Sequence, residues 1–323
     1  DTGGQPRESL RTVYGRIDQD IDRAIELLEK ARETTLAENN KSHINLYVAL
    51  GIKSRACLAE GDWDGAFKAA KRVIDEGGYA VGTKSDLTGG MNSLDKQNVM
   101  WGAGIQVADQ AGGYAGFFTH MDNKEGAYAK SAPKLISKQL YNRISATDIR
   151  RDWWDPSDKE SPYVSKKFSF ANVASFLGDY IYMRVEEMYF TAAEAALRLD
   201  DLKSARELMN TVMAERDPGY SANNRSGTLL GATTTTWTGS FLENILTHRR
   251  IELWGEYGRL FDVRRLGQGI DRRTDDGFSE ECISMMNRRN VNITKADTYD
   301  WVLTIPKAEL DANPNINEED QNP

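Results

Sequence analysis

The predicted fold is decided by residues 241–267, FLENILTHRRIELWGEYGRLFDVRRLG. Apolar side chains recur there every three or four residues, at Leu242, Ile245, Leu246, Leu253, Trp254, Tyr257, Leu260 and Phe261. Such a spacing places them on one face of a helix. Acidic and basic residues are interleaved three or four positions apart, so they can pair along or between helices. The stretch therefore predicts one long, ion-paired helix packed against a large apolar surface.

The same stretch allows a second interpretation, a metal or proton-transfer site built on His248 and Glu252. Helical zinc sites of the HExxH type need a second histidine, which this stretch lacks. The three histidines of the chain, at positions 43, 120 and 248, offer no metal-ligand spacing. Packing is therefore the favoured interpretation, and we predict neither a metal ion nor another cofactor.

Composition excludes several classes of protein. The 323 residues include 41 basic and 49 acidic side chains, for a formal net charge of −8, and no basic block argues for a nucleic-acid partner. No run approaches the roughly 18 apolar residues of a membrane-spanning helix. Cys57 and Cys282 are the only cysteines, and Cys57 lies in a helical apolar pattern, so we predict a buried thiol and no disulfide framework.

Two segments share a helix–turn–helix pattern. In residues 49–74 the sequence Gly-Asp-Trp at positions 61–63 is followed by Ala66, and in residues 189–212 Asp-Asp-Leu at positions 200–202 is followed by Ala205. Small residues at crossing points and a polar turn are typical of tetratricopeptide repeats, which bury one face against their neighbours. The sequence thus predicts a mainly α fold, with hairpins near residues 10–77 and 183–216 packed on residues 241–267.

Gly, Asn, Asp and Ser interrupt short apolar runs between the hairpins, which predicts loop-rich inserts with a few short strands. We expect a single domain with five parts: a helical repeat region at 1–78, a loop-rich insert at 79–180, a helical repeat at 181–216, a loop insert at 217–240, and the central helix with the C-terminal segment at 241–323. Inserts of this kind usually carry the function of a helical scaffold.

Three motifs, in order along most of the chain, resemble those of the SusD/RagB family. Residues 249–267 are similar to the family signature ERR.EL..EG.R..DL.R.G, although His248 replaces a usual Glu and Tyr257 is inserted in the Glu-Gly pair. Residues 184–195 resemble RLAEvYLiaAEA, and residues 305–323 resemble the ending PIP..E...NP....QNP. The resemblance implies a SusD-like fold built on tetratricopeptide-like hairpins.

The resemblance also implies a function. Members of that family are non-catalytic lipoproteins on the surface of the Gram-negative outer membrane, which bind oligo- or polysaccharide and deliver it to a SusC-type TonB-dependent transporter for nutrient uptake. The signal peptide, lipidated cysteine and first repeat helices of the family have no counterpart before Asp1. We therefore expect a fragment or a shortened relative, with membrane contact only through a lipid anchor absent from this chain.

Two other functions remain open. Glu186, Glu187 and Glu194 could supply the paired carboxylates of a glycoside hydrolase. Glu187 and Glu194 lie seven residues apart among alanines, however, and this pattern favours a packed or ion-paired helix and no catalytic residues. The third possibility is a repeat scaffold that binds only protein, in which the loop aromatics would be buried or scattered.

Aromatic residues outside the packing positions are the candidates for glycan contact. We assign Trp63, Trp101, Trp254 and Trp301 to packing, because they lie in helical or strand-like runs. A flat ring suits the CH-rich face of a pyranose. The predicted glycan-binding residues are Tyr114, Phe117, Phe118, Trp153, Trp154 and Trp237. We expect the group at 114–118 to meet Trp237 on one exposed face, whereas Trp153 and Trp154 have local packing as their alternative.

Overall fold

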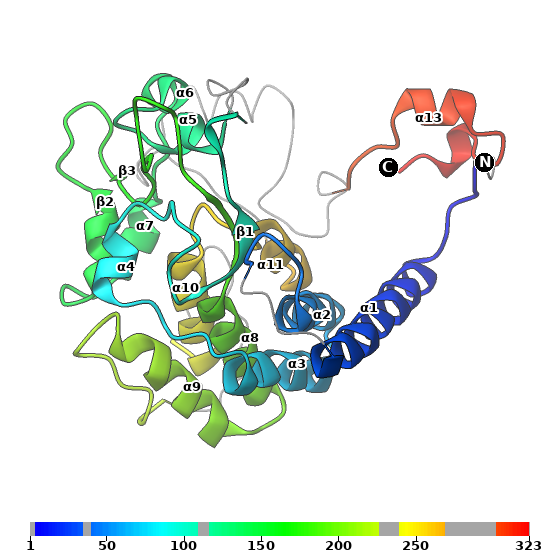
Figure 1. Cartoon of the computed structure of the whole chain (residues 1–323), viewed down its shortest axis with the longest axis horizontal. Coiled ribbons are helices and arrows are strands. Elements are labelled where there is room, and N and C mark those ends of the chain that lie inside the picture. The colour runs from blue at the N-terminus through cyan, green and yellow to red at the C-terminus, as the bar shows by residue number, and fades with distance from the viewer. Residues whose placement is uncertain (1–3, 35–39, 109–115, 226–238, 269–301, 323) are drawn as a thin grey trace.

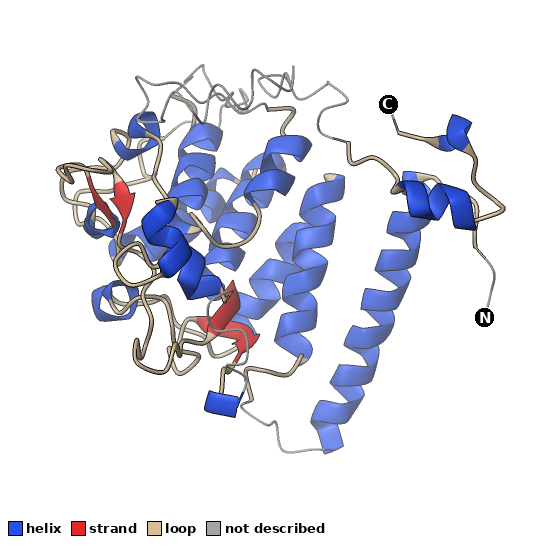
Figure 2. Ribbon diagram, turned by 90° about the horizontal axis from the view of Figure 1, so that it is seen from above, coloured by secondary structure: helices blue, strands red, loops and turns tan. Residues whose placement is uncertain are grey.

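The computed structural model describes residues 4–34, 40–108, 116–225, 239–268 and 302–322 (Figure 1). It is mainly helical, as predicted. The longer helices lie together, and the short elements of the insert cover one side of them (Figures 1 and 2). In the described ranges, no helix combines the length and the apolar character needed to cross a bilayer.

The first hairpin consists of α2 (Leu46–Glu60) and α3 (Trp63–Glu76), with α1 (Leu10–Thr34) packed on α2. Local signals fix its turn. Gly61 ends α2 in the left-handed conformation (φ 82°), and the Asp62 side chain caps α3 by accepting a hydrogen bond from the Gly65 amide (3.0 Å). The buried Cys57 thiol lies in α2. The predicted hairpin is confirmed in this region.

The second hairpin, α8 (Val185–Arg198) and α9 (Leu202–Ala214), packs on the first through α3. Nearly every residue of α8 is buried. Its alanines, among them Ala192, Ala193 and Ala196, have small side chains that let neighbouring helices approach closely, and they belong to one apolar core with residues of α2, α3, α9 and α10. The second predicted hairpin is confirmed, while its likeness to a tetratricopeptide repeat stays a prediction.

The central stretch is not the single long helix that we expected. It forms α10 (Phe241–Glu252), a turn, and α11 (Arg259–Arg265). Gly255 and Gly258 have φ angles of 74° and 107°. Side chains with a Cβ rarely adopt these values, so the two glycines provide the conformations that end one helix and start the next. As predicted, the stretch packs on the hairpins: α10 contacts α8, and α11 contacts α2.

The insert is built from short elements, most of them around a second apolar core. These elements are α4 (Lys84–Thr88), β1 (Val99–Ala103), α5 (Phe117–Met121), α6 (Ala127–Ser131), α7 (Lys138–Tyr141), the 3-10 helix η2 (Ile149–Trp153), β2 (Trp154–Asp155), β3 (Val164–Ser165) and β4 (Tyr180–Arg184). Strand β1 pairs antiparallel with β4, and β2 pairs antiparallel with β3. The C-terminal segment contains α13 (Lys307–Ala312) and the 3-10 helix η5 (Glu318–Asp320).

Candidate functional site

Half-buried rings gather in a groove of about 410 Å³ between the β1–β4 ladder, α2 and the turn that separates α10 from α11. We call it the aromatic groove and define it by Arg55, Trp101, Phe117, Tyr180, Tyr182 and Tyr257. Most of its wall is apolar, because these rings, together with Phe168 and Ile181, face the opening. Concave, mainly aromatic sites with few polar groups are typical ligand sites.

The strand pair supplies one rim of the groove. The rings of Trp101 on β1 and Tyr182 on β4 lie edge to face, with centroids 5.1 Å apart. Tyr182 is 42% exposed, and Trp101 is half-buried. Below this rim, the Phe117 ring lies 5.3 Å from Phe168, and the Phe117 amide donates a hydrogen bond to the Tyr180 hydroxyl (3.3 Å). These rings are therefore held in place by packing on one side and are exposed to the groove on the other.

The opposite wall depends on Arg55 of α2. Its guanidinium lies 3.7 Å from the centre of the Tyr257 ring, in a cation–π contact. Nε and Nη2 donate to the carboxylate of Glu187 (2.9 and 2.7 Å), and Nη2 also donates to the carbonyl of Tyr182 (2.7 Å). One side chain thus ties α2 to α8, to β4 and to the turn carrying Tyr257.

Glu256 also lies in the groove wall, but both oxygens of its carboxylate accept hydrogen bonds from buried side chains of the protein. Arg184 donates to both oxygens (2.7 and 2.8 Å), and the Lys167 ammonium donates to one of them (2.5 Å). Burial alone would raise the pKa of Glu256, yet Arg184 and Lys167 outweigh it and hold the pKa below its usual value. An ionised, doubly paired carboxylate cannot serve as a general acid.

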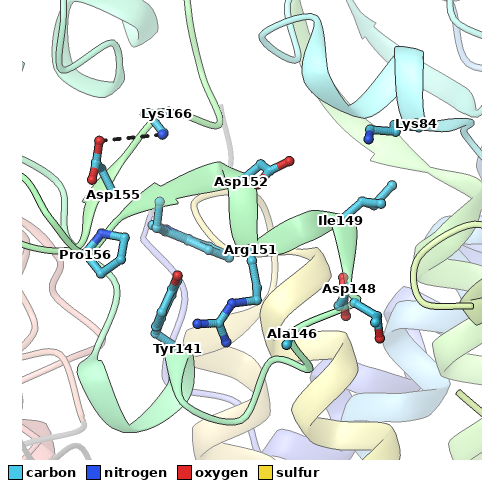
Figure 3. Close-up of a pocket in the computed structure, with 12 residues that line it drawn as sticks. Lys84, Tyr141, Ala146, Asp148, Ile149, Arg151, Asp152, Asp155, Pro156 and Lys166 are labelled. Atoms are coloured by element: carbon cyan, nitrogen blue, oxygen red, sulfur yellow. Dashed lines mark ion pairs between the residues drawn. The ribbon is translucent and has the colours of Figure 1, made fainter. Parts of the chain in front are cut away.

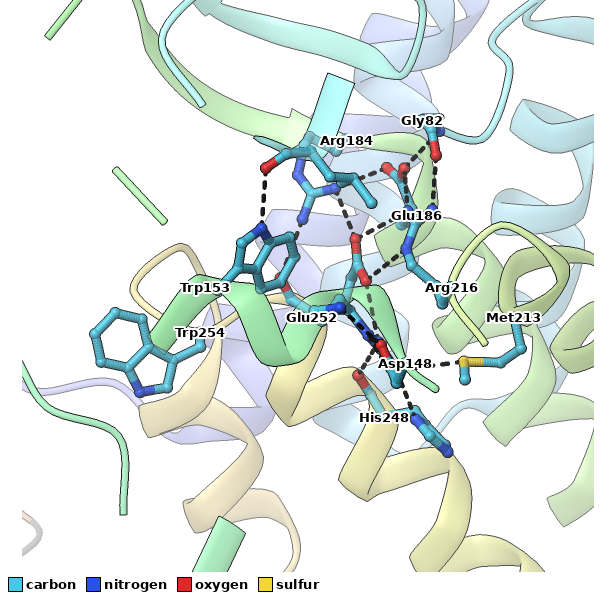
Figure 4. Close-up of polar contacts among 12 residues, drawn as sticks. Gly82, Asp148, Trp153, Arg184, Glu186, Met213, Arg216, His248, Glu252 and Trp254 are labelled. Carbon is cyan, nitrogen blue, oxygen red and sulfur yellow. Dashed lines mark hydrogen bonds and ion pairs between the residues drawn. The ribbon is translucent and has the colours of Figure 1, made fainter. Parts of the chain in front are cut away.

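Behind the groove lies a buried charge network, which consists of Asp148, Arg150, Lys167, Arg184, Glu186, Arg216, Glu252 and Glu256. Glu252 of α10 is its centre: Arg150, Arg184 and Arg216 donate to its carboxylate at 3.0–3.1 Å. Figure 4 shows this carboxylate between Arg184 and Arg216. Burial would raise the pKa of Glu252, but the three guanidinium groups hold it well below the usual value.

His248 belongs to the surroundings of this network and not to a metal site. Its Nδ1 lies 2.9 Å from a guanidinium nitrogen of Arg150. Burial, and then the positive charge of Arg150, lower the pKa of His248 well below its ordinary value, so the ring is neutral. The part of the chain that the structure describes contains no cluster of metal-ligating side chains. The interpretation of His248 and Glu252 as a metal or proton-transfer pair is not supported.

The three glutamates considered for hydrolysis are buried and paired. Glu186 accepts from Arg216 (2.8 Å), and Glu187 accepts from Arg55. Glu194 forms a bidentate pair with Arg265 of α11 (both 2.7 Å). Burial would raise the pKa of Glu194, but Arg265 lowers it below the usual value. None of these carboxylates faces open space as one of a pair, so the geometry does not favour glycoside hydrolysis.

A second hollow, of about 440 Å³, lies over η2 and β2 and is mainly polar (Figure 3). The Arg151 guanidinium lies over the Tyr141 ring there, 4.4 Å from the ring centre. Lys166 pairs with Asp155 at 3.6 Å. Trp154 contributes to the wall, but its ring is covered by protein. This polar pocket therefore offers charged groups and no open aromatic face.

Comparison with known proteins identifies the family. A family model, that of the SusD family, matches residues 119–323, which is more than half of the chain. The chain belongs to the SusD family. Among curated proteins, none matches the sequence.

Solved structures agree with this SusD-family assignment. A SusD-like carbohydrate binding protein from Bacteroides vulgatus has 26% identity and a TM-score of 0.78 over 98% of this chain and 67% of that one. A SusD superfamily protein from Bacteroides thetaiotaomicron has 22% identity and a TM-score of 0.75, over 100% and 68% of the two chains. Surface glycan-binding protein A from Bacteroides uniformis shares the fold at 16% identity, with a TM-score of 0.66 over 98% and 70%. The chain thus spans about two thirds of the length of these structures.

The predicted site residues of this SusD-family chain differ in their surroundings: one lines the aromatic groove, and others are buried in the insert. Phe117 lines the aromatic groove. Phe118, Trp153 and Trp154 are 2%, 2% and 1% exposed in the core of the insert, so the expectation that they offer an open ring is corrected. All three rings pack in one apolar cluster. In addition, the Trp153 indole N–H donates a hydrogen bond to the Leu87 carbonyl (2.9 Å). Positions 114 and 237 lie outside the described residues, and their predicted meeting with Phe117 stays a prediction.

Sequence reasoning missed most of the groove. Trp101, which was assigned to packing, does pack on the apolar core but also lines the groove. Tyr182, Tyr257 and Arg55 were not considered as site residues. One usable signal was present: Tyr180 and Tyr182 are aromatic residues two positions apart in a strand-like run. Alternate residues of a strand share a face, so two tyrosines at this spacing indicate an aromatic surface. Arg55 had no comparable signal, because its partners come from distant parts of the chain.

Proposed function

We propose that this SusD-family chain is a non-catalytic carbohydrate-binding protein and that the aromatic groove holds the glycan. The observation that carries the proposal is the gathering of Trp101, Phe117, Tyr180 and Tyr182 around one opening. Ring faces suit the CH-rich faces of sugar rings. The solved relative with 26% identity, described as a carbohydrate binding protein, supports the same ligand class.

The polar groups of the groove suit hydroxyl recognition. Arg55 uses Nε and Nη2 to hold Glu187 and the Tyr182 carbonyl. Among the described residues, its Nη1 makes no hydrogen bond and can donate to a ligand hydroxyl. Because the other two nitrogens already fix the guanidinium plane, little side-chain entropy is lost when a sugar binds. The hydroxyls of Tyr182 and Tyr257 add donors and acceptors at the two walls.

Binding is proposed to occur without turnover. The buried glutamates on α8 are paired with arginines, as is Glu256 in the groove wall. Purified protein incubated with a bound polysaccharide should release no reducing sugar. A reducing-sugar signal from the wild type that is absent from Glu194→Gln would replace this proposal with the hydrolase alternative.

Family membership supports a cellular role. We propose that the protein acts at the surface of the outer membrane, held there by a lipid anchor, and passes glycan to a SusC-type TonB-dependent transporter for nutrient uptake. Co-purification of a lipid-anchored form carrying this chain with such a transporter tests the partnership. Recovery of the transporter with no measurable glycan binding would favour the protein-binding scaffold instead.

A binding experiment tests the groove. A screen against plant, host and microbial polysaccharides first identifies a ligand, and calorimetry then compares wild type with Tyr182→Ala. Loss of a stacking ring should weaken binding by about 1 to 3 kcal/mol. Tyr128→Ala is the matched control, because Tyr128 is a tyrosine of similar exposure on α6 and outside the groove. Equal affinities of wild type, Tyr182→Ala and Trp101→Ala would show that the glycan binds elsewhere.

A further inference from the structure

One wall of the aromatic groove is formed by the turn between α10 and α11, residues 253–258, which carries Tyr257. Two residues of this turn, Gly255 and Gly258, have φ angles of 74° and 107°. Glycine has more backbone freedom than other residues, so such a turn keeps one conformation only where outside contacts fix it. Arg55 holds the ring of Tyr257. The backbone before this ring is held from another side.

Lys167 holds the turn from behind the groove. Its side chain is fully buried and does not line the groove. An ammonium group has three N–H donors. Its acceptors here are the carbonyl of Glu252 (2.7 Å), the carbonyl of Trp254 (2.8 Å) and the carboxylate of Glu256 (2.5 Å). All three acceptors lie in the segment that leads to Tyr257.

No other described group takes the place of Lys167 at the turn. Among the described residues, Lys167 is the sole donor to the Trp254 carbonyl. Arg184 also donates to Glu256 and to the Glu252 carbonyl, but it lies on β4, the strand at the rim of the groove. Loss of the lysine ammonium would therefore leave the Trp254 carbonyl without a partner, next to Gly255.

The position of the turn affects the shape of the groove. Lys167 is followed in the chain by Phe168, which lines the groove. Gly255 packs directly on the Phe168 ring, since an added Cβ atom there would lie 2.6 Å from a ring carbon. Lys167 thus ties the segment that carries Phe168 to the turn that carries Tyr257. How these two side chains are placed in the groove depends on its ammonium group.

We propose that Lys167 is a positioning residue of the aromatic groove, which holds the turn in the conformation that presents Tyr257 to the ligand. Lys167 itself contacts no ligand atom. This inference rests on the proposed function of the groove and adds a control of binding by pH. A neutral amine has two N–H groups and cannot donate to all three acceptors. Loss of the proton should therefore weaken glycan binding.

The surroundings of Lys167 place the loss of this proton near neutral pH. Burial lowers the pKa of Lys167 to about 8; the charge of Glu256 opposes this shift, and that of Arg184 adds to it. The charged groups that face the ammonium are Glu256 of the turn, Glu252 of α10 and Arg184 of β4. Despite burial, their ion pairs hold both glutamate pKa values below the usual value and the Arg184 pKa well above it. Of these four groups, only Lys167 titrates between about pH 7 and about pH 9.

The pH dependence of binding tests the inference. Calorimetry with an uncharged glycan from the screen compares wild type and Lys167→Met from about pH 7 to about pH 9. One lost hydrogen bond from a charged group corresponds to about tenfold in affinity. Wild-type affinity should then fall about fivefold over this range, because Lys167 is partly ionised at both ends. Lys167→Met should bind at least about tenfold more weakly than wild type at the lower pH and show no dependence on pH.

The sign of the effect separates positioning from stability. Because the pKa of Lys167 is lower in the folded chain, the unfolded chain keeps its proton to higher pH, and loss of the proton favours folding as pH rises. A fall in affinity is therefore opposite in sign to the change in stability that the same group causes. The wild-type profile needs no variant, so it decides the question even if Lys167→Met does not fold.

Lys41→Met is the matched control. Lys41 also donates to two backbone carbonyls, those of Leu94 and Lys96, and burial lowers its pKa, but it lies outside the groove. This variant should keep both the affinity and the pH profile of wild type, and a flat profile would assign the pH dependence to Lys41 instead.

One further variant separates failure of this inference from failure of the proposed function. If Tyr182→Ala weakens binding but wild-type affinity stays constant over this pH range, the groove stands and the role of Lys167 is wrong. If no saccharide binding depends on Tyr182, the proposed function itself fails.

Discussion

The aromatic groove and the buried charge network share the turn between α10 and α11 but use their polar groups differently. In the network, charges are paired with each other and shielded from water, so they hold elements of the fold together. In the groove, rings are packed on one side and open on the other. Glu256 lies at the boundary, and its oxygens are taken by Arg184 and Lys167. A charged residue beside a cleft therefore need not contact the ligand.

The largest effect is expected from the centre of the network. Glu252→Ala would leave Arg150, Arg184 and Arg216 without their common carboxylate. Removing one partner of a buried ion pair costs roughly 3 to 5 kcal/mol of unfolding free energy. Three guanidinium groups lose their shared carboxylate here, although Arg150 keeps Asp148, and Arg184 and Arg216 keep Glu186. Urea denaturation measures the loss of stability. Glu207→Ala, at an exposed glutamate of α9, should change stability little. Equal urea-denaturation midpoints for the two variants would contradict the prediction for Glu252.

A somewhat smaller loss is expected at Trp153, which the sequence made a candidate for sugar contact. Its ring is packed in the insert core, with the Lys167 ammonium 4.5 Å from the ring centre. Trp153→Ala should cost about 3 kcal/mol of stability. At a temperature where the variant stays folded, its glycan affinity should match wild type. A Trp153→Ala protein of unchanged stability but weakened glycan binding would show that Trp153 contacts the glycan.

Acid should destabilise the protein through its buried ion pairs, which are those of the charge network and that of Glu194 with Arg265. Burial opposes ionisation of Glu194, Glu252 and Glu256, but arginines (and Lys167 at Glu256) hold all three pKa values below the ordinary 4.5. A depressed folded-state pKa contributes stability above the unfolded pKa and loses it as pH falls toward the folded value. Denaturation midpoints should therefore drop below about pH 4.5. Glu194→Gln should show a shallower drop, and an identical pH profile would contradict this account.

The smallest expected effect is an alkaline one at Lys167. Burial lowers the pKa of this lysine from 10.5 to about 8, although Glu256 opposes the change. Between these two values the unfolded chain binds more protons than the folded one, so the contribution of Lys167 makes stability rise with pH. Lys167→Met should lack this rise. The measurement is the difference in midpoint between the two proteins on either side of that window, and a constant difference would show that Lys167 does not titrate there.

Sequence predicted the hairpins because their signals are local. Gly61 and Asp62 act within one turn of the residues they cap. The break at Gly255 and Gly258 was missed because the apolar spacing runs through it uninterrupted. Whether an aromatic side chain is exposed could not be predicted either. The strand-like run around Trp101 indicated packing, yet Trp101 lines the groove, whereas the candidate Trp153 is buried. Burial of Trp153 depends on Leu87, which lies 66 residues away along the chain.

The two glycines of the turn have a practical consequence for redesign. Because Gly255 and Gly258 set the backbone there, Tyr257 can change without altering the course of the chain. Phe261 has the same freedom, since α11 is anchored through Asp262 and Val263. A library limited to positions 257 and 261 would therefore vary the rings beside the groove on an unchanged scaffold, whereas one that includes position 252 would lower the stability of most of its members.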